Sequence, residues 1–273
     1  MFRTKTALVT LIFIICASPA RSQTADEQWK GLVMQALYAA SSNDYTKAEQ
    51  TFLRAMHEAE RFGAQDARVG TTLNSLGLVY RAEKKYGDAE SAYRRALAVL
   101  EKTYGEGSID VANINFNIAT VMFDQNHLQT ALPYAQKALM SYEVLLGGQS
   151  LKTAAASCMV GDSFRAVKSY LEAEGPLRRC ADIRESDGGL QNPDLAQAQQ
   201  SLALALQGQG KLTQAEARFK LAEKIRENTL GITSPLLAQT MEDHASLLRQ
   251  MGRDKEAERL MTMVSAIRRT RKK

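Results

Sequence analysis

Hydrophobic residues recur three and four positions apart along most of this chain. The clearest stretch is residues 73–96, in which Leu73 and Leu76 share one helical face and Ala89 and Tyr93 share another. This spacing is typical of amphipathic α-helices. The sequence contains no alternating run of Val, Ile or Thr long enough for a strand. The stretch therefore predicts two short helices joined by a tight turn.

The same pattern returns at a fixed interval. An alanine near the start of each second helix recurs at Ala48, Ala89, Ala131, Ala173, Ala215 and Ala257, at spacings of 41, 42, 42, 42 and 42 residues. Internal repeats of this length indicate a solenoid. One helical hairpin cannot bury its apolar faces alone, so each unit needs neighbours on both sides. The repeat therefore predicts a continuous array.

The predicted fold class is all-α, an α-solenoid of about six antiparallel helix pairs spanning residues 25–269. The first helices are expected at residues 25–41, 67–83, 109–125, 151–167, 194–210 and 236–251. The second helices are expected at residues 45–62, 86–104, 128–146, 170–187, 212–230 and 254–269. The repeats then run over about 25–66, 67–108, 109–150, 151–193, 194–235 and 236–269. Gly residues follow the second helices, and Ser, Asp or Pro precede the next ones, as expected at helix boundaries.

The repeat resembles a known family. The pattern L-x-x-L-G-x-x-Y at residues 73–80, followed by A-x-x-x-Y-x-x-A at residues 89–96, is similar to a tetratricopeptide repeat with Leu in place of the usual Trp. The period of 42 residues resembles that of the kinesin-light-chain-like subclass. This resemblance implies a right-handed superhelix in which the first helices line a concave groove. Such grooves bind an extended peptide or a helix of a partner protein.

Matching positions to the family pattern gives candidates for the groove lining. They are Asn74, Leu78, Arg81, Asn113, Phe116, Asn117, Thr120, Arg165 and Gln200. Asn and Gln amides carry both a donor and an acceptor, so they can pair with the backbone of a peptide of any sequence. The alternative is that these are merely solvated positions on the helices. Both interpretations stay open for Asn74 and Asn117, whereas solvated positions are favoured for the others.

The sequence offers no pattern of catalytic residues, no metal site and no cofactor motif. The three histidines, His57, His127 and His244, fall in separate repeats, without Cys, His or acidic partners at metal-ligand spacing. There is no Gly-rich phosphate loop and no G-x-S-x-G motif. The prediction is a non-catalytic interaction scaffold without a cofactor.

Residues 1–22 have the features of a signal peptide. Arg3 and Lys5 precede an uncharged apolar run over residues 7–17, which is too short for a membrane-spanning helix of about 20 residues. Small residues at positions 18 and 20 favour cleavage after Ala20. The protein is therefore expected to be periplasmic or secreted, with no integral membrane span after cleavage. The alternative is a protein that remains anchored by an uncleaved N-terminal segment.

Cleavage also changes the charge. The net charge of +5 falls to +3, because Arg3 and Lys5 leave and no acid does. The remaining basic excess lies largely at the C-terminus, and residues 270–273 form a basic tail. A tail of this kind is more often a solvated helix end than a nucleic-acid site. The expected partner is a protein or peptide, and not a nucleic acid.

Two cysteines remain after the signal peptide, Cys158 and Cys180, both in the fourth repeat. They are expected at similar heights on antiparallel helices. Cys158 is expected to face the groove and Cys180 the packing between the two helices. A disulfide requires Cα atoms roughly 4.4–6.8 Å apart. Because the two side chains are expected to point in different directions, the sequence favours two free cysteines, which act as small apolar residues, rather than a disulfide.

The ends of the array offer a second type of surface. A terminal unit of a solenoid needs a polar outer face. The last helix carries Leu260, Met261, Met263, Val264 and Ile267, and the first helix is also apolar. Either end is therefore a candidate surface for self-association or for a partner complex. The alternative is that these residues pack inward on their own repeats.

Overall fold

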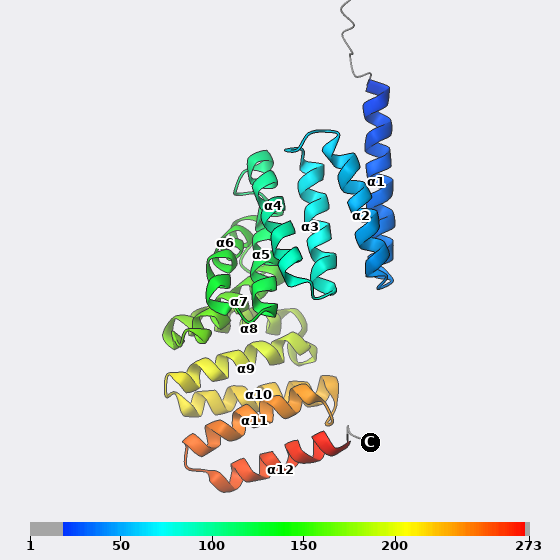
Figure 1. The fold of residues 1–273 in the computed structure, drawn as a ribbon. Coiled ribbons are helices and arrows are strands. Elements are labelled where there is room, and N and C mark those ends of the chain that lie inside the picture. Colours follow the sequence, from blue (N-terminus) through cyan, green and yellow to red (C-terminus); the bar gives the residue numbers. More distant parts are fainter. Residues whose placement is uncertain (1–18, 271–273) are drawn as a thin grey trace, which may run out of the picture.

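The computed structural model describes residues 19–270, which form twelve α-helices and one short 3₁₀-helix (Figure 1). The first helices of the pairs are α1 (Pro19–Ser41), α3 (Ala67–Ala82), α5 (Ile109–Asp124), α7 (Leu151–Ala166), α9 (Pro193–Gly208) and α11 (Pro235–Gln250). The second helices are α2 (Tyr45–Glu60), α4 (Tyr86–Tyr104), α6 (Leu128–Leu146), α8 (Tyr170–Gly188), α10 (Leu212–Leu230) and α12 (Asp254–Thr270). The 3₁₀-helix η1 (Gly189–Gln191) joins α8 to α9. No strand occurs among the described residues, so the all-α solenoid of six helix pairs is confirmed.

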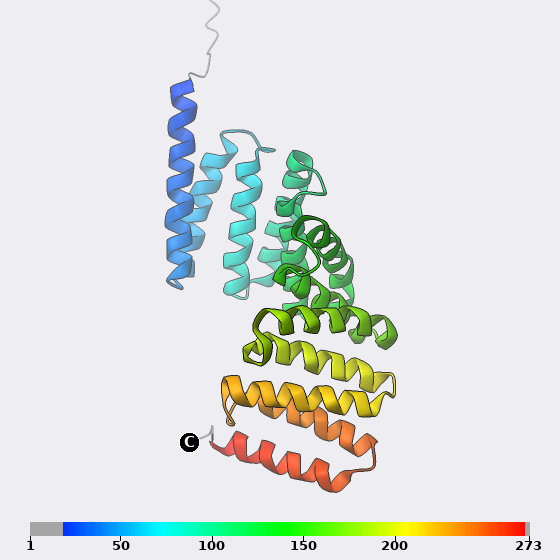
Figure 2. The same cartoon turned by 180° about the vertical axis from the view of Figure 1, so that it is seen from behind.

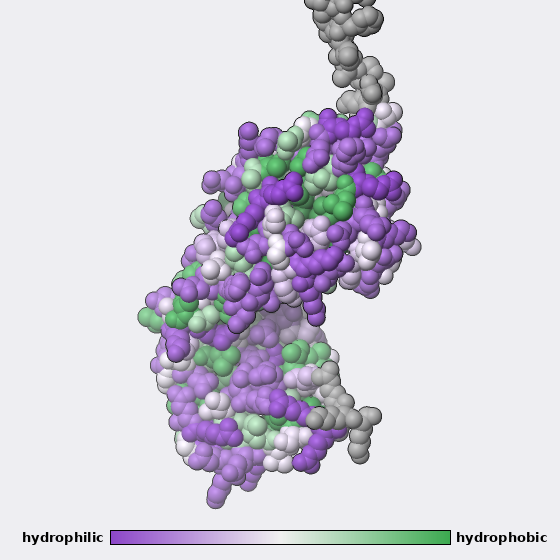
Figure 3. Space-filling view, in the orientation of Figure 1, coloured by the Kyte–Doolittle hydropathy of each residue, from purple (hydrophilic) through white to green (hydrophobic). Residues whose placement is uncertain are grey.

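The helices stack in chain order into one continuous array (Figures 1 and 2). Helices α1 to α4 stand nearly upright in these views, whereas α9 to α12 run across them, so the array twists along its length. Figure 3 shows the surface hollowed between these two halves. Most of the predicted signal peptide and residues 271–273 of the basic tail lie outside the described residues.

The helix boundaries repeat with the same period as the packing. The side chains of Asp66, Ser108, Ser150 and Asn192 each accept a hydrogen bond from a backbone N–H in the first turn of the following helix. These residues are 42 positions apart, and each satisfies a donor that a helix start leaves free. This periodic capping fixes where each of these first helices begins.

Where two paired helices cross, a glycine on the first helix faces a large side chain on the second. Gly77 of α3 faces the ring of Tyr93 of α4, and Gly161 of α7 faces Leu177 of α8. Both large side chains are fully buried. The absence of a Cβ at each glycine leaves the space that the opposing side chain fills.

Ion pairs connect successive repeats on the second helices. The Glu174 carboxylate of α8 accepts two hydrogen bonds of 2.7 Å. One comes from Arg178 Nη2 of the same helix and the other from Lys211 Nζ of the next repeat. Glu216 of α10 lies 42 residues later, with Lys220 at 2.6 Å and Arg253 at 2.7 Å. The hydrogen bonds from Lys211 and Arg178 lower the pKa of Glu174 to about 2.

Replacing Glu174 with Gln is expected to lower the free energy of unfolding by about 1–2 kcal/mol at pH 7, because two charge-assisted bonds lose their acceptor charge. The folded-state pKa is lower than the unfolded one, so this contribution is present above the ordinary value of 4.5 and disappears as the pH falls towards about 2. Urea unfolding of both proteins at several pH values measures the effect. A stability difference that stays constant down to pH 2 would contradict it.

The two ends of the array differ from each other. In α12, Val264 and Ile267 are buried and pack against α11, and Met263 is an exposed large apolar residue. At this end the alternative of inward packing describes the helix, because most of its apolar residues lie in clusters with α11. In α1, by contrast, Met34, Leu37 and Tyr38 are exposed.

Cys158 and Cys180 form a disulfide, with their Cα atoms 5.3 Å apart. The expectation of two free cysteines is therefore wrong. Cys158 holds the repeat position of Phe116, and Cys180 holds that of Ala138. Phe116 packs against the cluster that contains Ala138. A side chain at the position of Phe116 and Cys158 therefore extends from the first helix towards a small residue of the second helix. In the fourth repeat this brings the two sulfur atoms together.

Candidate functional site

Five of the predicted groove residues line one pocket of about 450 Å³. They are Asn74, Leu78, Asn113, Phe116 and Asn117. The pocket is completed by Tyr142 of α6 and by Leu151, Lys152 and Ala155 of α7. We refer to these nine residues as the amide pocket, because three Asn side chains form its polar part.

The amides are held in place by bonds that leave other groups free. Asn117 Nδ2 donates to Asn74 Oδ1 at 2.9 Å. Asn113 Oδ1 accepts from Tyr142 Oη at 3.0 Å and from Lys152 Nζ at 2.8 Å. The NH₂ groups of Asn74 and Asn113 and the side-chain oxygen of Asn117 have no hydrogen-bond partner among residues 19–270. The pocket therefore presents donors and an acceptor in fixed positions.

The rest of the lining is apolar apart from one cation. Leu78 and Leu151 are exposed large apolar residues, and the Phe116 ring centroid lies 6.1 Å from that of Tyr142. Lys152 Nζ lies 5.7 Å from the centroid of the Tyr142 ring and has no carboxylate partner among the described residues. Burial raises the pKa of Tyr142, so the phenol stays neutral and donates to Asn113.

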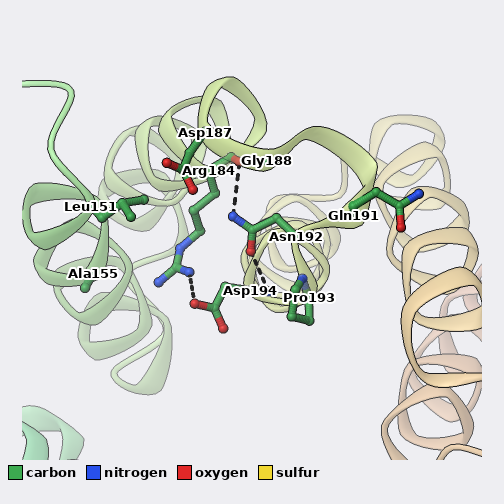
Figure 4. A pocket seen from close by; sticks show the side chains of 9 residues that line it. All are labelled: Leu151, Ala155, Arg184, Asp187, Gly188, Gln191, Asn192, Pro193 and Asp194. Carbon is green, nitrogen blue, oxygen red and sulfur yellow. Dashed lines mark hydrogen bonds and ion pairs between the residues drawn. The ribbon is translucent and has the colours of Figure 1, made fainter.

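A second pocket of about 430 Å³ adjoins the amide pocket, because Leu151 and Ala155 line both (Figure 4). Its other wall comes from α8, η1 and the start of α9, and its remaining lining residues are Arg184, Asp187, Gly188, Gln191, Asn192, Pro193 and Asp194. Figure 4 shows Arg184 reaching from α8 to pair with Asp194, while Gln191 points away. We refer to this site as the α8–α9 pocket.

The predictions missed the contribution of the second helices. Tyr142 and Arg184 occupy the same repeat position, as do Arg226 and Arg268. Each places a polar tip against a first helix, since Arg226 donates to Gln197 at 2.8 Å and Arg268 to Glu242 at 2.8 Å. A search of the sequence for polar residues spaced 42 positions apart on the second helices would have found Tyr142 and Arg184, which line the two pockets.

The other predicted residues lie outside the amide pocket. Arg81 pairs with Asp124 at 2.5 Å, and Thr120 donates to the Phe116 carbonyl oxygen at 2.8 Å. Arg165 pairs with Asp162 at 3.1 Å and lines a different pocket with Tyr170 and other residues. None of these three residues belongs to the lining of the amide pocket.

Gln200 is not an open groove residue, so its prediction is wrong. Only 6% of it is exposed, and both ends of its amide are occupied. Its Oε1 accepts from Arg226 Nη1 at 2.6 Å, and its Nε2 donates to Asp243 Oδ2 at 2.5 Å. Burial lowers the pKa of Arg226, and a buried guanidinium needs oxygen acceptors around it. Gln200 supplies one of them.

Residues 19–270 contain no group of three His, Cys, Asp or Glu side chains arranged to hold a metal ion. Within the same residues, no helix has the length and apolar character needed to cross a membrane.

The tetratricopeptide repeat family model matches residues 32–102, 68–143, 110–186 and 194–270. No curated protein matches the sequence. Among solved structures, the chain is similar to BtubC (BKLC) from P. vanneervenii, with 25% identity and a TM-score of 0.64 over 78% of this chain and 84% of that chain. A putative kinesin light chain from Podospora anserina gives 18% identity and a TM-score of 0.65 over 76% and 98%.

A Rap protein complexed with competence and sporulation factor is also similar, with 19% identity and a TM-score of 0.53 over 92% of this chain and 79% of that chain. At these identities the Rap and Podospora structures are informative about the fold alone. The period of 42 residues, the twelve helices and the matched repeats agree with one another. The chain therefore belongs to the tetratricopeptide repeat family, and proteins of kinesin-light-chain type are among its structural neighbours.

Proposed function

We propose that this protein is an exported, non-catalytic interaction module that binds an extended segment of a partner protein in the amide pocket. The observation that carries the proposal is the Asn117–Asn74 hydrogen bond, which orients two amides and leaves a donor and an acceptor free. A peptide backbone offers one acceptor and one donor per residue, so it is complementary to this pair. The complex of the similar Rap protein with competence and sporulation factor supports a ligand-binding use of this fold.

The apolar lining gives such a segment an anchor. Leu78, Phe116 and Leu151 surround the amides, and the exposed Leu78 and Leu151 side chains would be covered by an apolar side chain of the partner. Burial of apolar area contributes about 25 cal/mol per Å². Backbone pairing with the amides and one buried anchor together describe a site for an extended peptide.

Export is part of the proposal, and two features support it. Residues 1–22 have the composition of a signal peptide, and the Cys158–Cys180 disulfide suits an oxidising compartment. Cleavage after Ala20 would remove the first two residues of α1. A periplasmic or secreted location follows from the proposal, whereas an uncleaved segment would instead keep the protein on a membrane.

The Asn74→Ala/Asn117→Ala variant is expected to lose selection of peptides from a phage-displayed library of random 12-residue sequences. The wild type should enrich peptides that share an apolar residue. The matched control is Gln207→Ala/Gln250→Ala, which removes an amide–amide bond of 3.0 Å between residues also 43 apart, outside the amide pocket. Sequencing of the enriched phage, with thermal unfolding of each variant, gives the result.

Equal enrichment by wild type and the Asn74→Ala/Asn117→Ala variant would rule out the amide pocket as the binding site. Loss of enrichment in both double variants would show that the effect is not specific to this pocket. In either case, the exposed apolar residues of α1 would be the next candidate for a binding surface.

Self-association through α1 is the second candidate function. Met34, Leu37 and Tyr38 lie at positions i, i+3 and i+4, so they form one exposed apolar face, and 76% of Tyr38 is exposed. A strict monomer in light scattering at high concentration would exclude this candidate.

A further inference from the structure

The Cys158–Cys180 disulfide lies beside residues that line the two pockets, since Cys158 follows Leu151 and Ala155 on α7 and Cys180 contacts Arg184. Leu151, Ala155 and Cys158 are spaced as i, i+4 and i+7, so they share one face of α7. The first two line both pockets. Cys158 also holds the repeat position of Asn74 and Phe116, which line the amide pocket. The disulfide therefore takes the place of a groove residue in the fourth repeat.

The two cysteine residues differ in exposure. Cys158 is partly exposed, whereas Cys180 is completely buried. A thiol approaching from the groove therefore meets Cys158 first. Thiol–disulfide exchange requires the attacking sulfur to reach one sulfur of the bond and the other sulfur to leave as a thiolate. The exposures make Cys158 the attacked atom and Cys180 the leaving group.

A cation stands beside the leaving sulfur. Arg184 Nε donates to Cys180 Sγ at 3.3 Å, and only 14% of the Arg184 side chain is exposed. A neighbouring guanidinium stabilises a thiolate. Arg184 also pairs with Asp194, whose side chain is 71% exposed, and this carboxylate offsets part of the positive charge. The pair therefore sets the charge experienced by Cys180.

We propose that Cys158 and Cys180 form an exchangeable disulfide that captures a cysteine of a polypeptide bound in the groove. The partner's thiol first gives its proton to solvent. Its thiolate then attacks Cys158 Sγ, the Cys158–Cys180 bond breaks, and a mixed disulfide forms on Cys158. The electron pair of the broken bond leaves with Cys180 Sγ as a thiolate beside Arg184. Attack by this thiolate on Cys158 reverses the step and releases the partner.

This inference rests on the proposed function for its natural partner, but its chemistry can be tested without that partner. The probe is reduced glutathione, added to the folded mature protein. Free thiols are then blocked with N-ethylmaleimide at acidic pH, and peptide mass spectrometry locates each modification. Glutathione is expected on Cys158 and N-ethylmaleimide on Cys180, with a rate that is unchanged by low, non-denaturing urea concentrations.

Two substitutions at the same ion pair are expected to change the rate in opposite directions. Arg184→Gln should slow the exchange by a factor of roughly three to ten, because the leaving thiolate loses its cation. Asp194→Asn should accelerate it, because Arg184 loses its competing carboxylate. A merely structural ion pair would give the same direction in both variants, since both break it.

Glutathione found first on Cys180 would overturn the proposal. So would a rate that rises with urea, because the bond would then react only after the protein opens. Rate changes in the same direction for both substitutions would remove Arg184 from the mechanism. If Cys158 exchanges but the amide pocket selects no peptides, the exchange chemistry stands and the proposed function is refuted. If the amide pocket selects peptides but Cys158 does not exchange, the proposed function stands and the exchangeable disulfide is refuted.

Discussion

Replacement of both Cys158 and Cys180 by alanine is expected to lower the free energy of unfolding by about 3 kcal/mol. The disulfide joins residues 22 positions apart. Its removal lets the unfolded chain adopt more conformations, and a closed loop of this length corresponds to about 3 kcal/mol. Alanine is the suitable replacement because Cys180 is fully buried, and a serine there would add an unpaired hydroxyl.

Urea unfolding followed by circular dichroism measures the change. The wild type treated with a reducing agent provides the control, because it should lose a similar amount of stability while the double alanine variant should not respond. If the reducing agent leaves the wild type unchanged while mass spectrometry shows two free thiols, the disulfide does not stabilise the fold.

Introduction of a single methyl group at Gly77 is expected to cost about 1–3 kcal/mol. A Cβ built on Gly77 would lie 2.5 Å from Cε1 of the Tyr93 ring. The ring is rigid and fully buried, so it has little room to turn aside. Gly77→Ala therefore forces α3 and α4 apart, and thermal or urea unfolding records the loss.

Gly31→Ala is the matched control for this substitution. Gly31 lies inside α1, and an added Cβ would meet nothing within 4 Å. Alanine is favoured over glycine by roughly 0.5–1 kcal/mol within a helix, so Gly31→Ala is expected to stabilise the protein. Stabilisation by Gly77→Ala as well would show that the small-to-large packing at Tyr93 does not limit the approach of the helices.

The fold could be predicted well because its determinants are local. The positions of Leu73, Leu76, Ala89 and Tyr93 select helices, and their return after 42 residues selects an array. Most predicted helix bounds lie within a few residues of the observed ones, with the largest difference at the start of α1. Capping residues such as Ser108 and Ser150 are also visible in the sequence, since they recur at the same period.

The groove was predicted in part. Asn74, Asn113 and Asn117 meet in one pocket because they lie on the same side of successive first helices. Gln200 shares the position of Phe116 but is buried, because Arg226 of a second helix reaches across to it. The position of a residue within the repeat predicts which side of the helix its side chain faces. The side chains of neighbouring helices decide whether its polar groups remain available to a partner.

The sequence by itself determined the helices, their period, the array and the family. Only the tertiary structure decided that the two cysteines are joined, and which amides are occupied by neighbours and which remain available to a partner. The physical reason is the range of the interactions. Helix formation and repeat spacing depend on residues a few positions apart or at one fixed interval. The cysteine bond joins residues 22 positions apart, and the Asn74–Asn117 bond joins residues 43 apart. Both depend on distances of a few ångströms that are set by how whole helices pack.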